Sequence, residues 1–285
     1  MTRQVALIGK PLKRRHSQVM HDAAFDAAGI DARYVLAEIE PHEVAPAVAA
    51  ARGAGWLGLG VTAPYKRVVT SLVDEVEDDA LTIGAVNNVV RTEDGRLVGF
   101  NSDAPGFTAG VELAMGRSLA GTEVVVAGAG GAAHAIVFAA LSGGARRLTI
   151  GNRTAESAAA LAERFAGIGG ADVAAVRLGD QSFTEALASA DLAVNATTVG
   201  MIDPGVTIDV GVLPDPATVF DLVYVPAETS LLRTARARGL RAANGSEMLI
   251  AQAAIAFERW TGVGGMDGVM RDAIAPLLAD PTARA

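Results

Sequence analysis

Short apolar runs alternate with helical patterns through the first part of the chain. Strand-like runs occupy residues 4–9, 32–39 and 57–62, and helices are expected near residues 19–28 and 42–52. Strands that alternate with helices are typical of parallel sheets with helices on both faces. The pattern therefore predicts an α/β fold for this segment.

A hairpin pattern comes next. Two apolar runs, residues 87–92 and 96–101, flank an Asp-Gly pair at residues 94 and 95, which is a strong turn signal. A helix is expected from residue 105 onward, and it leads into a second series of strands and helices. This second series includes buried strands near residues 192–197 and 219–223.

The end of the chain carries two amphipathic helical patterns, residues 246–262 and 266–280. Ser246 is predicted to cap the first of these helices. Because an apolar helix face needs a partner, we expect both helices to fold back onto the first domain.

A glycine-rich turn joins an apolar strand to a helix in the stretch EVVVAGAGGAAHAIVFAAL, residues 123–141. Gly128 permits a tight turn, Gly130 lets backbone amides approach a pyrophosphate, and Ala133 lets helix and strand pack closely. The N–H groups at the start of the helix then face the anion. The segment predicts a Rossmann-type, doubly wound dinucleotide-binding domain.

The turn after the next strand favours NADP as the cofactor. A site for NAD normally has a carboxylate at the end of this strand, where it accepts a hydrogen bond from the ribose hydroxyl. Here the sequence reads Asn152-Arg153-Thr154, and a guanidinium can pair with a 2′-phosphate. NAD remains possible, since a surface arginine after a strand is also common.

Composition restricts the function classes. A chain of 285 residues predicts two domains. It has no cysteine, which excludes disulfides and thiolate chemistry. With only four histidines, a metal site is not expected either. A net charge of −8 disfavours a nucleic-acid partner, and no apolar run predicts a membrane span. The first residues lack a secretory pattern, so the cytoplasm is the expected compartment.

Three short segments of the first domain carry candidate chemistry. Lys66 follows a strand and a Thr-x-Pro turn, Asn87 lies in GAVNN where a helix gives way to a strand, and Asn101 and Asp103 lie in FNSD. Open α/β sheets bind ligands at the carboxyl ends of their strands, where Lys66 is expected. Taken singly, each residue could also be a solvated lysine, a turn asparagine or a helix cap.

Taken together, these segments resemble the shikimate dehydrogenase family. The motifs VTAPYK, GAVNN, FNSD, GAGGAA, NRT, NATTVG, DLVYVPAET and EMLIAQAAIAFERW occur in the family's order across nearly the whole chain. The resemblance implies an N-terminal α/β substrate domain, a Rossmann-type NADP domain and C-terminal helices that return to the first domain. It also implies reversible hydride transfer between NADP and a hydroxylated ring carboxylate, most simply shikimate, in aromatic amino acid biosynthesis.

The resemblance further implies roles for individual residues. The family's lysine and aspartate fall on Lys66 and Asp103, which makes them the catalytic pair. The substrate contacts carried over are Ser17, Thr62, Asn87, Tyr224 and Gln252. The cofactor contacts carried over are Gly128, Ala129, Gly130, Gly131, Ala132, Asn152, Arg153, Thr154, Thr197, Gly245 and Met248.

Three positions depart from the family pattern, and all concern the substrate. Arg15 stands at the first position of a Ser-x-Ser pair that holds the carboxylate in the family; it could bind the carboxylate through two parallel hydrogen bonds or exclude shikimate. Gly60 replaces a frequent Asn, and Glu247 alters the motif before Gln252. Quinate, an aminoshikimate or a related polyhydroxy acid therefore remain alternative substrates, and a non-catalytic NADP-binding sensor remains an alternative class.

The expected boundaries are residues 1–104 for the substrate domain, 105–243 for the NADP domain and 244–285 for the returning helices. Joints near residues 103–107 and 242–245 suggest a hinge. For catalysis the Lys66 ammonium must lie beside the reactive face of the nicotinamide. The oligomeric state, monomer or homodimer, stays open.

Overall fold

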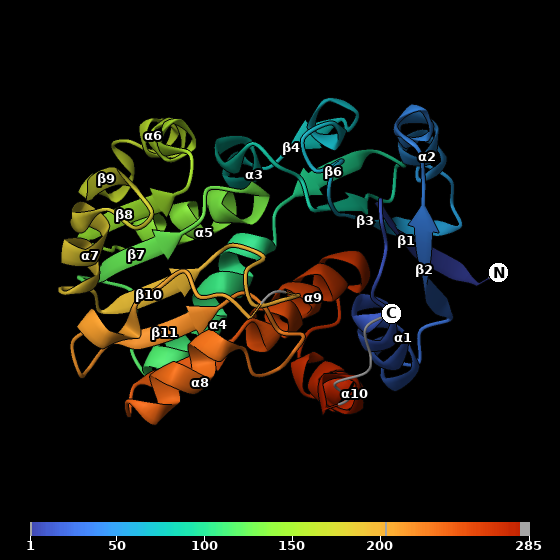
Figure 1. The fold of residues 1–285 in the computed structure, drawn as a ribbon. Coiled ribbons are helices and arrows are strands. Elements are labelled where there is room, and N and C mark those ends of the chain that lie inside the picture. The colour runs from blue at the N-terminus through green and yellow to red at the C-terminus, as the bar shows by residue number, and fades with distance from the viewer. Residues whose placement is uncertain (1, 203, 280–285) are drawn as a thin grey trace. The chain divides into compact units, whose positions relative to one another are not determined.

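The computed structural model describes residues 2–202 and 204–279, which divide into two compact units (Figure 1). Unit 1 comprises the chain up to Asp103 together with the chain from Ile250, and unit 2 runs Ala104–Leu249. Both transitions fall inside helices, since α4 spans Asp103–Met115 and α9 spans Ser246–Thr261.

Unit 1 contains one mixed sheet. Its strands are β1 (Arg3–Gly9), β2 (Ala32–Glu38), β3 (Trp56–Val61), β4 (Glu75–Val76), β5 (Asn88–Arg91) and β6 (Leu97–Phe100). Its helices are α1 (His16–Ala27), α2 (Val44–Ala50), α3 (Asp78–Ile83), most of α9, and α10 (Asp267–Ala279).

The strand order in this sheet is β2-β1-β3-β5-β6-β4. Strands β2, β1 and β3 are parallel, whereas β5 runs antiparallel to both β3 and β6. The β5–β6 pair is the predicted hairpin, and Gly95 takes a φ of +85° in its turn. A positive φ suits glycine because no Cβ clashes there, so the Asp-Gly signal is confirmed.

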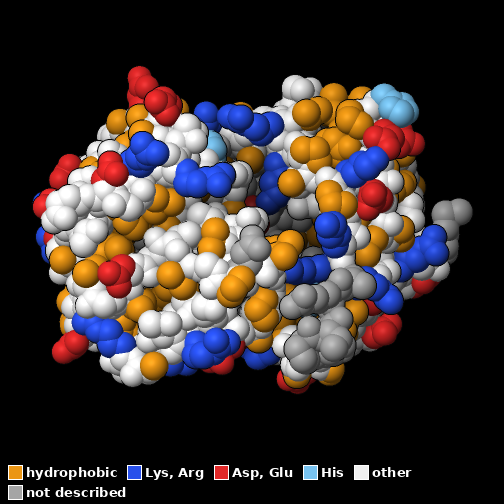
Figure 2. Space-filling view, viewed as in Figure 1, with side chains coloured by type: hydrophobic (Ala, Val, Ile, Leu, Met, Phe, Trp, Pro, Cys, Tyr) orange, Lys and Arg blue, Asp and Glu red, His pale blue; other side chains and the backbone are white. Residues whose placement is uncertain are grey.

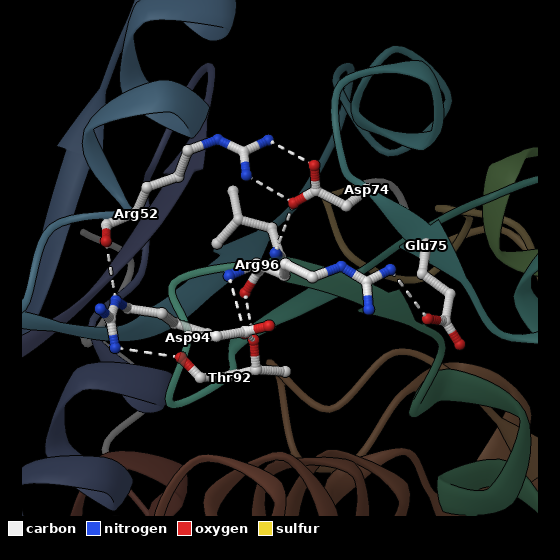
Figure 3. Close-up of polar contacts among 8 residues, drawn as sticks. Arg52, Asp74, Glu75, Thr92, Asp94 and Arg96 are labelled. Atoms are coloured by element: carbon white, nitrogen blue, oxygen red, sulfur yellow. Dashed lines mark hydrogen bonds and ion pairs between the residues drawn. The ribbon is translucent and has the colours of Figure 1, made fainter.

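Charged side chains tie this hairpin to the rest of unit 1 (Figure 3). Arg52, which follows α2, donates to both oxygens of Asp74, at 2.5 and 3.1 Å. Asp74 also accepts the backbone N–H of Leu97 at 2.7 Å, and Arg96 lies 3.4 Å from Glu75. These contacts fix the register between the hairpin and the short edge strand β4.

The two faces of the sheet in unit 1 are covered by different helices. On one face, Leu59 and Val61 pack with Val44 and Val48 of α2. On the other face, Trp260 of α9 donates its indole N–H to the carbonyl oxygen of Val89, at 2.9 Å. Helix α10 packs beside α1. The predicted return of the C-terminal helices to the first domain is confirmed.

Unit 2 contains one parallel sheet. Its strands are β7 (Glu123–Ala127), β8 (Arg147–Asn152), β9 (Asp172–Arg177), β10 (Leu192–Asn195), β11 (Thr218–Asp221) and β12 (Arg241–Asn244). Besides α4, its helices are α5 (Gly131–Ser142), α6 (Ala155–Arg164), α7 (Gln181–Leu187) and α8 (Ser230–Ala237).

Helices cover both faces of this sheet, as predicted for a doubly wound fold. Successive strand residues point to opposite faces. Val219 of β11 packs in a core with Phe183 of α7 and Leu231 of α8. Its neighbour Phe220 meets Phe107 of α4 edge to face, with ring centroids 5.7 Å apart.

The strand order in unit 2, β12-β11-β10-β7-β8-β9, reverses direction between β7 and β10. The chain leaves β7 toward β8 on one side, whereas β10 lies on the other. Ligands of such sheets bind outside the carboxyl ends of the strands at this switch point. The glycine-rich turn follows β7 and therefore lies there.

The structure differs from the sequence prediction in several local features. A joint between domains was expected near residues 242–245, but Arg241–Asn244 form β12, which pairs with β11 over four residues. Residues 41–43 form a separate 3₁₀ turn before α2. Helix α9 begins at Ser246 itself, whose hydroxyl donates to the Asn244 side chain at 2.6 Å instead of acting as the residue before the helix.

Two features are absent from the described residues. No helix within them is both long and apolar enough to cross a bilayer. Within the same part of the chain, no three His, Cys, Asp or Glu side chains are grouped to hold a metal ion.

On the face shown in Figure 2, basic and acidic side chains are interspersed with hydrophobic ones.

Candidate active site

Lys66 lies in the turn that follows β3 in unit 1. The strand ends at Val61, and the backbone N–H of Val86 donates to the carbonyl oxygen of Lys66 at 2.9 Å. This bond fastens the turn to the segment before β5. Lys66 is thereby held at the carboxyl end of a central strand, where the sequence predicted it.

Asp103 is the first residue of α4 and faces Lys66. Its carboxylate lies 2.5 Å from the Lys66 ammonium, and the two side chains are 17% and 27% exposed. Asn101 fixes the chain just before α4. Its side-chain oxygen accepts a hydrogen bond from the N–H of Asp103 at 3.0 Å, and its side-chain amide donates to the carbonyl oxygen of Ala85 at 2.9 Å. The two predicted catalytic residues therefore form a positioned ion pair that solvent still reaches.

Asn87 is buried in a network of polar side chains beside this pair. Its side-chain oxygen accepts from the N–H of Ser102 and from the amide of Asn88, both at 2.8 Å. The hydroxyl of Ser102 reaches Gln252 of α9 at 3.3 Å. Two predicted substrate residues, Asn87 and Gln252, are thus joined through Ser102.

The loops after β1 and β3 lie against each other because these two strands are parallel neighbours. A Cβ added to Gly9 would lie 2.3 Å from the Thr62 side chain, so only glycine allows this approach. The N–H of Lys10 donates to the carbonyl oxygen of Ala63 at 3.1 Å. Thr62 and the loop that leads into α1 therefore lie at the same edge of the sheet.

Arg15 and Ser17 lie at the start of α1. Arg15 is the residue before the helix, and no side chain caps this end. The Arg15 guanidinium is exposed, and its Nε donates to Gln18 at 3.2 Å. Gln18 in turn donates to the carbonyl oxygen of Tyr34, at 3.2 Å. The arrangement presents a cation, a hydroxyl and helix N–H groups to an anion.

The glycine-rich turn of unit 2 has the geometry of a phosphate cradle. Gly128 takes a φ of +115°, and its N–H donates to Gly151 at 2.7 Å. At Gly130 and Gly131 an added Cβ would meet nothing within 4 Å, and no side chain caps the start of α5. Free N–H groups and open space at a helix N-terminus fit a pyrophosphate. Ala129 and Ala132 complete this segment.

The turn after β8 presents a single cation. Asn152 ends the strand, and its amide donates to the carbonyl oxygen of Thr154 at 3.0 Å, which shapes the turn before α6. Arg153 between them is exposed, and within residues 2–202 and 204–279 it has no hydrogen-bond or ion-pair partner. Its guanidinium is therefore available to a phosphate.

Thr197 lies directly beside the glycine-rich turn. A Cβ added to Gly128 would lie 2.9 Å from the Thr197 methyl group. The Thr197 hydroxyl donates to Asn195 at 2.7 Å, and the Asn195 amide donates to Asp221 at 2.8 Å. Burial raises the pKa of the Asp221 carboxyl, against the lowering effect of hydrogen bonds from Thr229 and others.

The remaining predicted contacts of unit 2 lie after β11 and at the start of α9. Tyr224 follows β11 and is partly buried. An added Cβ at Gly245 would lie 2.4 Å from the carbonyl oxygen of Leu222, so the position requires glycine. Met248 packs closely on Gly110 of α4.

Several residues of these networks were missed by sequence reasoning. Asn88, Ser102, Asn195 and Asp221 are all at most 4% exposed and all hydrogen-bonded. Each lies inside or next to a motif that the sequence analysis singled out. A polar residue inside an otherwise apolar strand was the available signal, because buried polar groups require partners.

Three family models match the chain. They are described as the shikimate dehydrogenase substrate binding domain, residues 7–89; shikimate / quinate 5-dehydrogenase, residues 111–202; and the shikimate 5'-dehydrogenase C-terminal domain, residues 245–274.

Whole-chain comparisons agree with these matches. Shikimate dehydrogenase (NADP(+)) of Moorella thermoacetica is 40% identical over 98% of this chain and 96% of its own length. Shikimate 5-dehydrogenase of Thermus thermophilus, solved with NADP(H) and shikimate, is 35% identical with a TM-score of 0.82, over 95% of this chain and 99% of its own. Quinate dehydrogenase of Corynebacterium glutamicum, solved with NAD, is 34% identical with a TM-score of 0.89, over 97% of this chain and 99% of its own length. The chain belongs to the shikimate dehydrogenase family.

Proposed function

We propose that this protein catalyses the reversible, NADP-dependent oxidation of a hydroxylated ring carboxylate, with shikimate and 3-dehydroshikimate as the first pair to test. The observation that carries the proposal is the 2.5 Å contact between Lys66 and Asp103 at the carboxyl end of β3, beside the buried Asn87. Membership of the family supports the reaction class.

Lys66 is the proposed acid and base. Bound NADP supplies the hydride acceptor for the oxidation. When the alcohol is oxidised, the Lys66 amine takes the hydroxyl proton; in the reverse direction its ammonium returns a proton to the carbonyl oxygen. Asp103 orients the amine and accepts a hydrogen bond from a substrate hydroxyl. Because the pair is only partly buried, both groups remain accessible to a ligand.

The proposed substrate residues form two groups, one that binds the ring carboxylate and one that binds the ring hydroxyls. Arg15 and Ser17 bind the carboxylate, since a guanidinium forms parallel hydrogen bonds with it and helix α1 begins there. Thr62, Asn87 and Gln252 bind the ring hydroxyls, and Tyr224 of unit 2 is the remaining contact. An arginine in place of a serine makes the site more selective for acids over neutral polyols.

Unit 2 is the proposed NADP domain, and unit 1 is the proposed substrate domain. The segment 128–132 would hold the pyrophosphate, and Asn152, Arg153 and Thr154 would hold the adenosine end, with Arg153 on the 2′-phosphate. Thr197, Gly245 and Met248 would line the rest of the cofactor site. Residues 1–104, 105–243 and 244–285 remain the proposed functional division, and the cytoplasm remains the proposed compartment.

Quinate is the second candidate substrate. The similarity to a quinate dehydrogenase solved with NAD favours it, as does the altered carboxylate end at Arg15. Both acids share the ring carboxylate and vicinal hydroxyls, so the same residues serve either one. The Lys66–Asp103 pair argues against a sensor, because binding alone needs no such pair.

Initial rates with NADP and with NAD, measured across shikimate, quinate and an aminoshikimate, test the proposal. Lys66→Ala should lower kcat by at least about a hundredfold, the range typical of general acid–base groups, while the dissociation constant for NADP stays within twofold. Arg67→Ala, which removes the adjacent exposed cation, serves as the matched control. Near-normal turnover in Lys66→Ala would overturn the assignment.

A further inference from the structure

Arg15 is held by a single side-chain hydrogen bond. Its Nε donates to the side-chain oxygen of Gln18, three residues on in α1, at 3.2 Å. It forms no ion pair and no other side-chain hydrogen bond with the residues in the ranges 2–202 and 204–279. A long exposed side chain loses conformational entropy when a ligand orders it. A contact that orders Arg15 beforehand therefore matters for the affinity of a ligand at this position.

Gln18 is itself anchored to the sheet of unit 1. Its side-chain amide donates to the carbonyl oxygen of Tyr34 at 3.2 Å, and the N–H of the same residue donates to Asp22 at 2.8 Å. Tyr34 lies in β2, the edge strand of the sheet, where backbone groups on the outer side have no neighbouring strand. Two side chains of α1 thus close this edge, and one of them connects Arg15 to the backbone of a strand.

The two neighbours of Gln18 allow only one orientation of its amide. The carbonyl oxygen of Tyr34 accepts and the Nε–H of Arg15 donates, so the amide nitrogen faces the strand and the amide oxygen faces the guanidinium. A reversed amide would place two oxygens together on one side and two N–H groups together on the other. The Gln18 side chain is therefore fixed from both ends.

The arrangement leaves the terminal nitrogens of Arg15 available. A guanidinium has one N–H on Nε and two on each Nη, so four N–H groups remain when Nε is bonded. One from each Nη gives the parallel pair that a carboxylate accepts. Helix α1 leads from the carboxyl end of β1 to the amino end of β2. The Arg15 backbone therefore lies about 4.5 Å nearer than that of Gln18 to the carboxyl edge, where such sheets bind ligands.

A carboxylate on the same helix face does not neutralise Arg15. Asp22 follows Gln18 by one turn on this face, so the glutamine lies between the guanidinium and the carboxylate. Burial raises the pKa of Asp22, whereas the hydrogen bond from the Tyr34 N–H and the charge of Arg15 lower it. Asp22 thus bonds to the strand, and the charge of Arg15 remains available to an external anion.

We propose that Gln18 is a positioning residue: it holds the Arg15 guanidinium at the start of α1 with both terminal nitrogens free for the carboxylate of the ring acid. The inference rests on the proposed function and deepens it. The preference for acids over neutral polyols then depends on the Arg15–Gln18 pair and not on Arg15 alone. Without Gln18 the cation is still present, but its ordering opposes the binding of the acid.

Gln18→Leu tests the inference because it removes both hydrogen bonds and keeps a side chain of similar bulk. The KM for the acid should rise about fivefold, as expected for one lost hydrogen bond, while kcat and the KM for NADP stay within twofold. Arg15→Ala should raise the same KM at least as much. In the Arg15→Ala background, Gln18→Leu should change the KM by less than twofold, because no guanidinium is left to position.

Asp22→Ala is the matched control. It removes the other side-chain bond to the Tyr34 backbone, and Asp22 makes no hydrogen bond to Arg15. Its Tm should fall at least as much as that of Gln18→Leu, while the KM for the acid stays within twofold. A rise in KM equal to that in Gln18→Leu would mean that closure of the β2 edge, and not the position of Arg15, controls binding.

The two proposals fail in distinguishable ways. If the wild-type protein turns over one of the acids and Gln18→Leu leaves the KM within twofold, or raises it equally with and without Arg15, the role of Gln18 is overturned and the proposed function stands. If the wild-type protein turns over none of the acids, the proposed function falls and this inference falls with it.

Discussion

At the scale of the residue, His21 shows how the aromatic cluster around Tyr34 controls a titration. The ring lies between Tyr34 and the α9 residues Phe257 and Trp260, at centroid distances of 4.5, 6.3 and 5.1 Å. None of these neighbours carries a charge at neutral pH. Burial alone therefore lowers the pKa of His21 from 6.5 to about 3.

This shift makes the stability of the protein depend on pH. Between about pH 6.5 and pH 3, His21 is protonated in the unfolded chain but neutral in the folded chain. The free energy of unfolding therefore rises with pH through this window. Above about pH 6.5, His21 is neutral in both states and does not lower the free energy of unfolding. Below this pH, the free energy of unfolding falls by about 1.4 kcal/mol for each pH unit. We expect His21→Phe to reduce the loss of unfolding free energy between pH 7 and pH 5 by about 2 kcal/mol, measured by urea denaturation.

His42→Gln is the control for this experiment. His42 lies on the surface in the 3₁₀ turn before α2, away from the aromatic cluster. An equal loss of acid sensitivity in His42→Gln, or none in His21→Phe, would contradict the attribution to burial.

At the scale of the element, the sequence predicted the long periodic segments and the Asp-Gly hairpin. It did not predict β4, β9 or β12. Two of these strands, β9 and β12, are edge strands of unit 2, with one partner each. Strand β9 is partly exposed along its length, and β12 is only four residues long. A short or half-solvated strand carries little apolar periodicity, so its formation depends on the neighbour it pairs with.

The candidate site was predictable where one motif contained the whole feature. Gly128, with its positive φ, is an example. Lys66 and Asp103 lie in two separate motifs, 37 residues apart, and their pairing was expected only from the family resemblance. The supporting contacts were not predictable, because they join residues far apart in the chain. The approach of Tyr34 to Gly60 is the clearest case, since it depends on the order of β2, β1 and β3 in the sheet.

That approach gives a test at the level of paired strands. Gly60→Ala places a Cβ 2.6 Å from the Tyr34 oxygen, which is too close, and overpacking of this kind costs about 1–3 kcal/mol. In a Tyr34→Phe background the oxygen is absent, so we expect Gly60→Ala to cost at least about 1 kcal/mol less there. Urea denaturation of the four proteins in this double-mutant cycle measures the difference. Equal costs in the two backgrounds would mean that the phenol does not lie over residue 60.

At the scale of the whole molecule, two compact units carry two different sets of polar groups. Unit 1 contains the ion pair and the Asn87 network, and unit 2 contains the glycine-rich turn and Arg153. Each unit has its own sheet and its own hydrophobic core. Each set of groups would therefore bind its own ligand, and the two binding events can be observed separately.

Hydrogen exchange can assign each ligand to its unit. A ligand that binds only the folded state stabilises it by about 2.7 kcal/mol at a concentration one hundredfold above its dissociation constant. NADP alone should therefore slow exchange about a hundredfold at amides of β7, β8 and α5 that open only when unit 2 unfolds, and it should leave β1 and β3 nearly unchanged. The ring acid alone should protect residues 62–66 and 86–88 instead. Strands β1 and β3 of unit 1 are the internal control. Their equal protection by NADP would contradict the prediction that the two units respond separately, since it would mean that the cofactor binds to both units or that the two units unfold together.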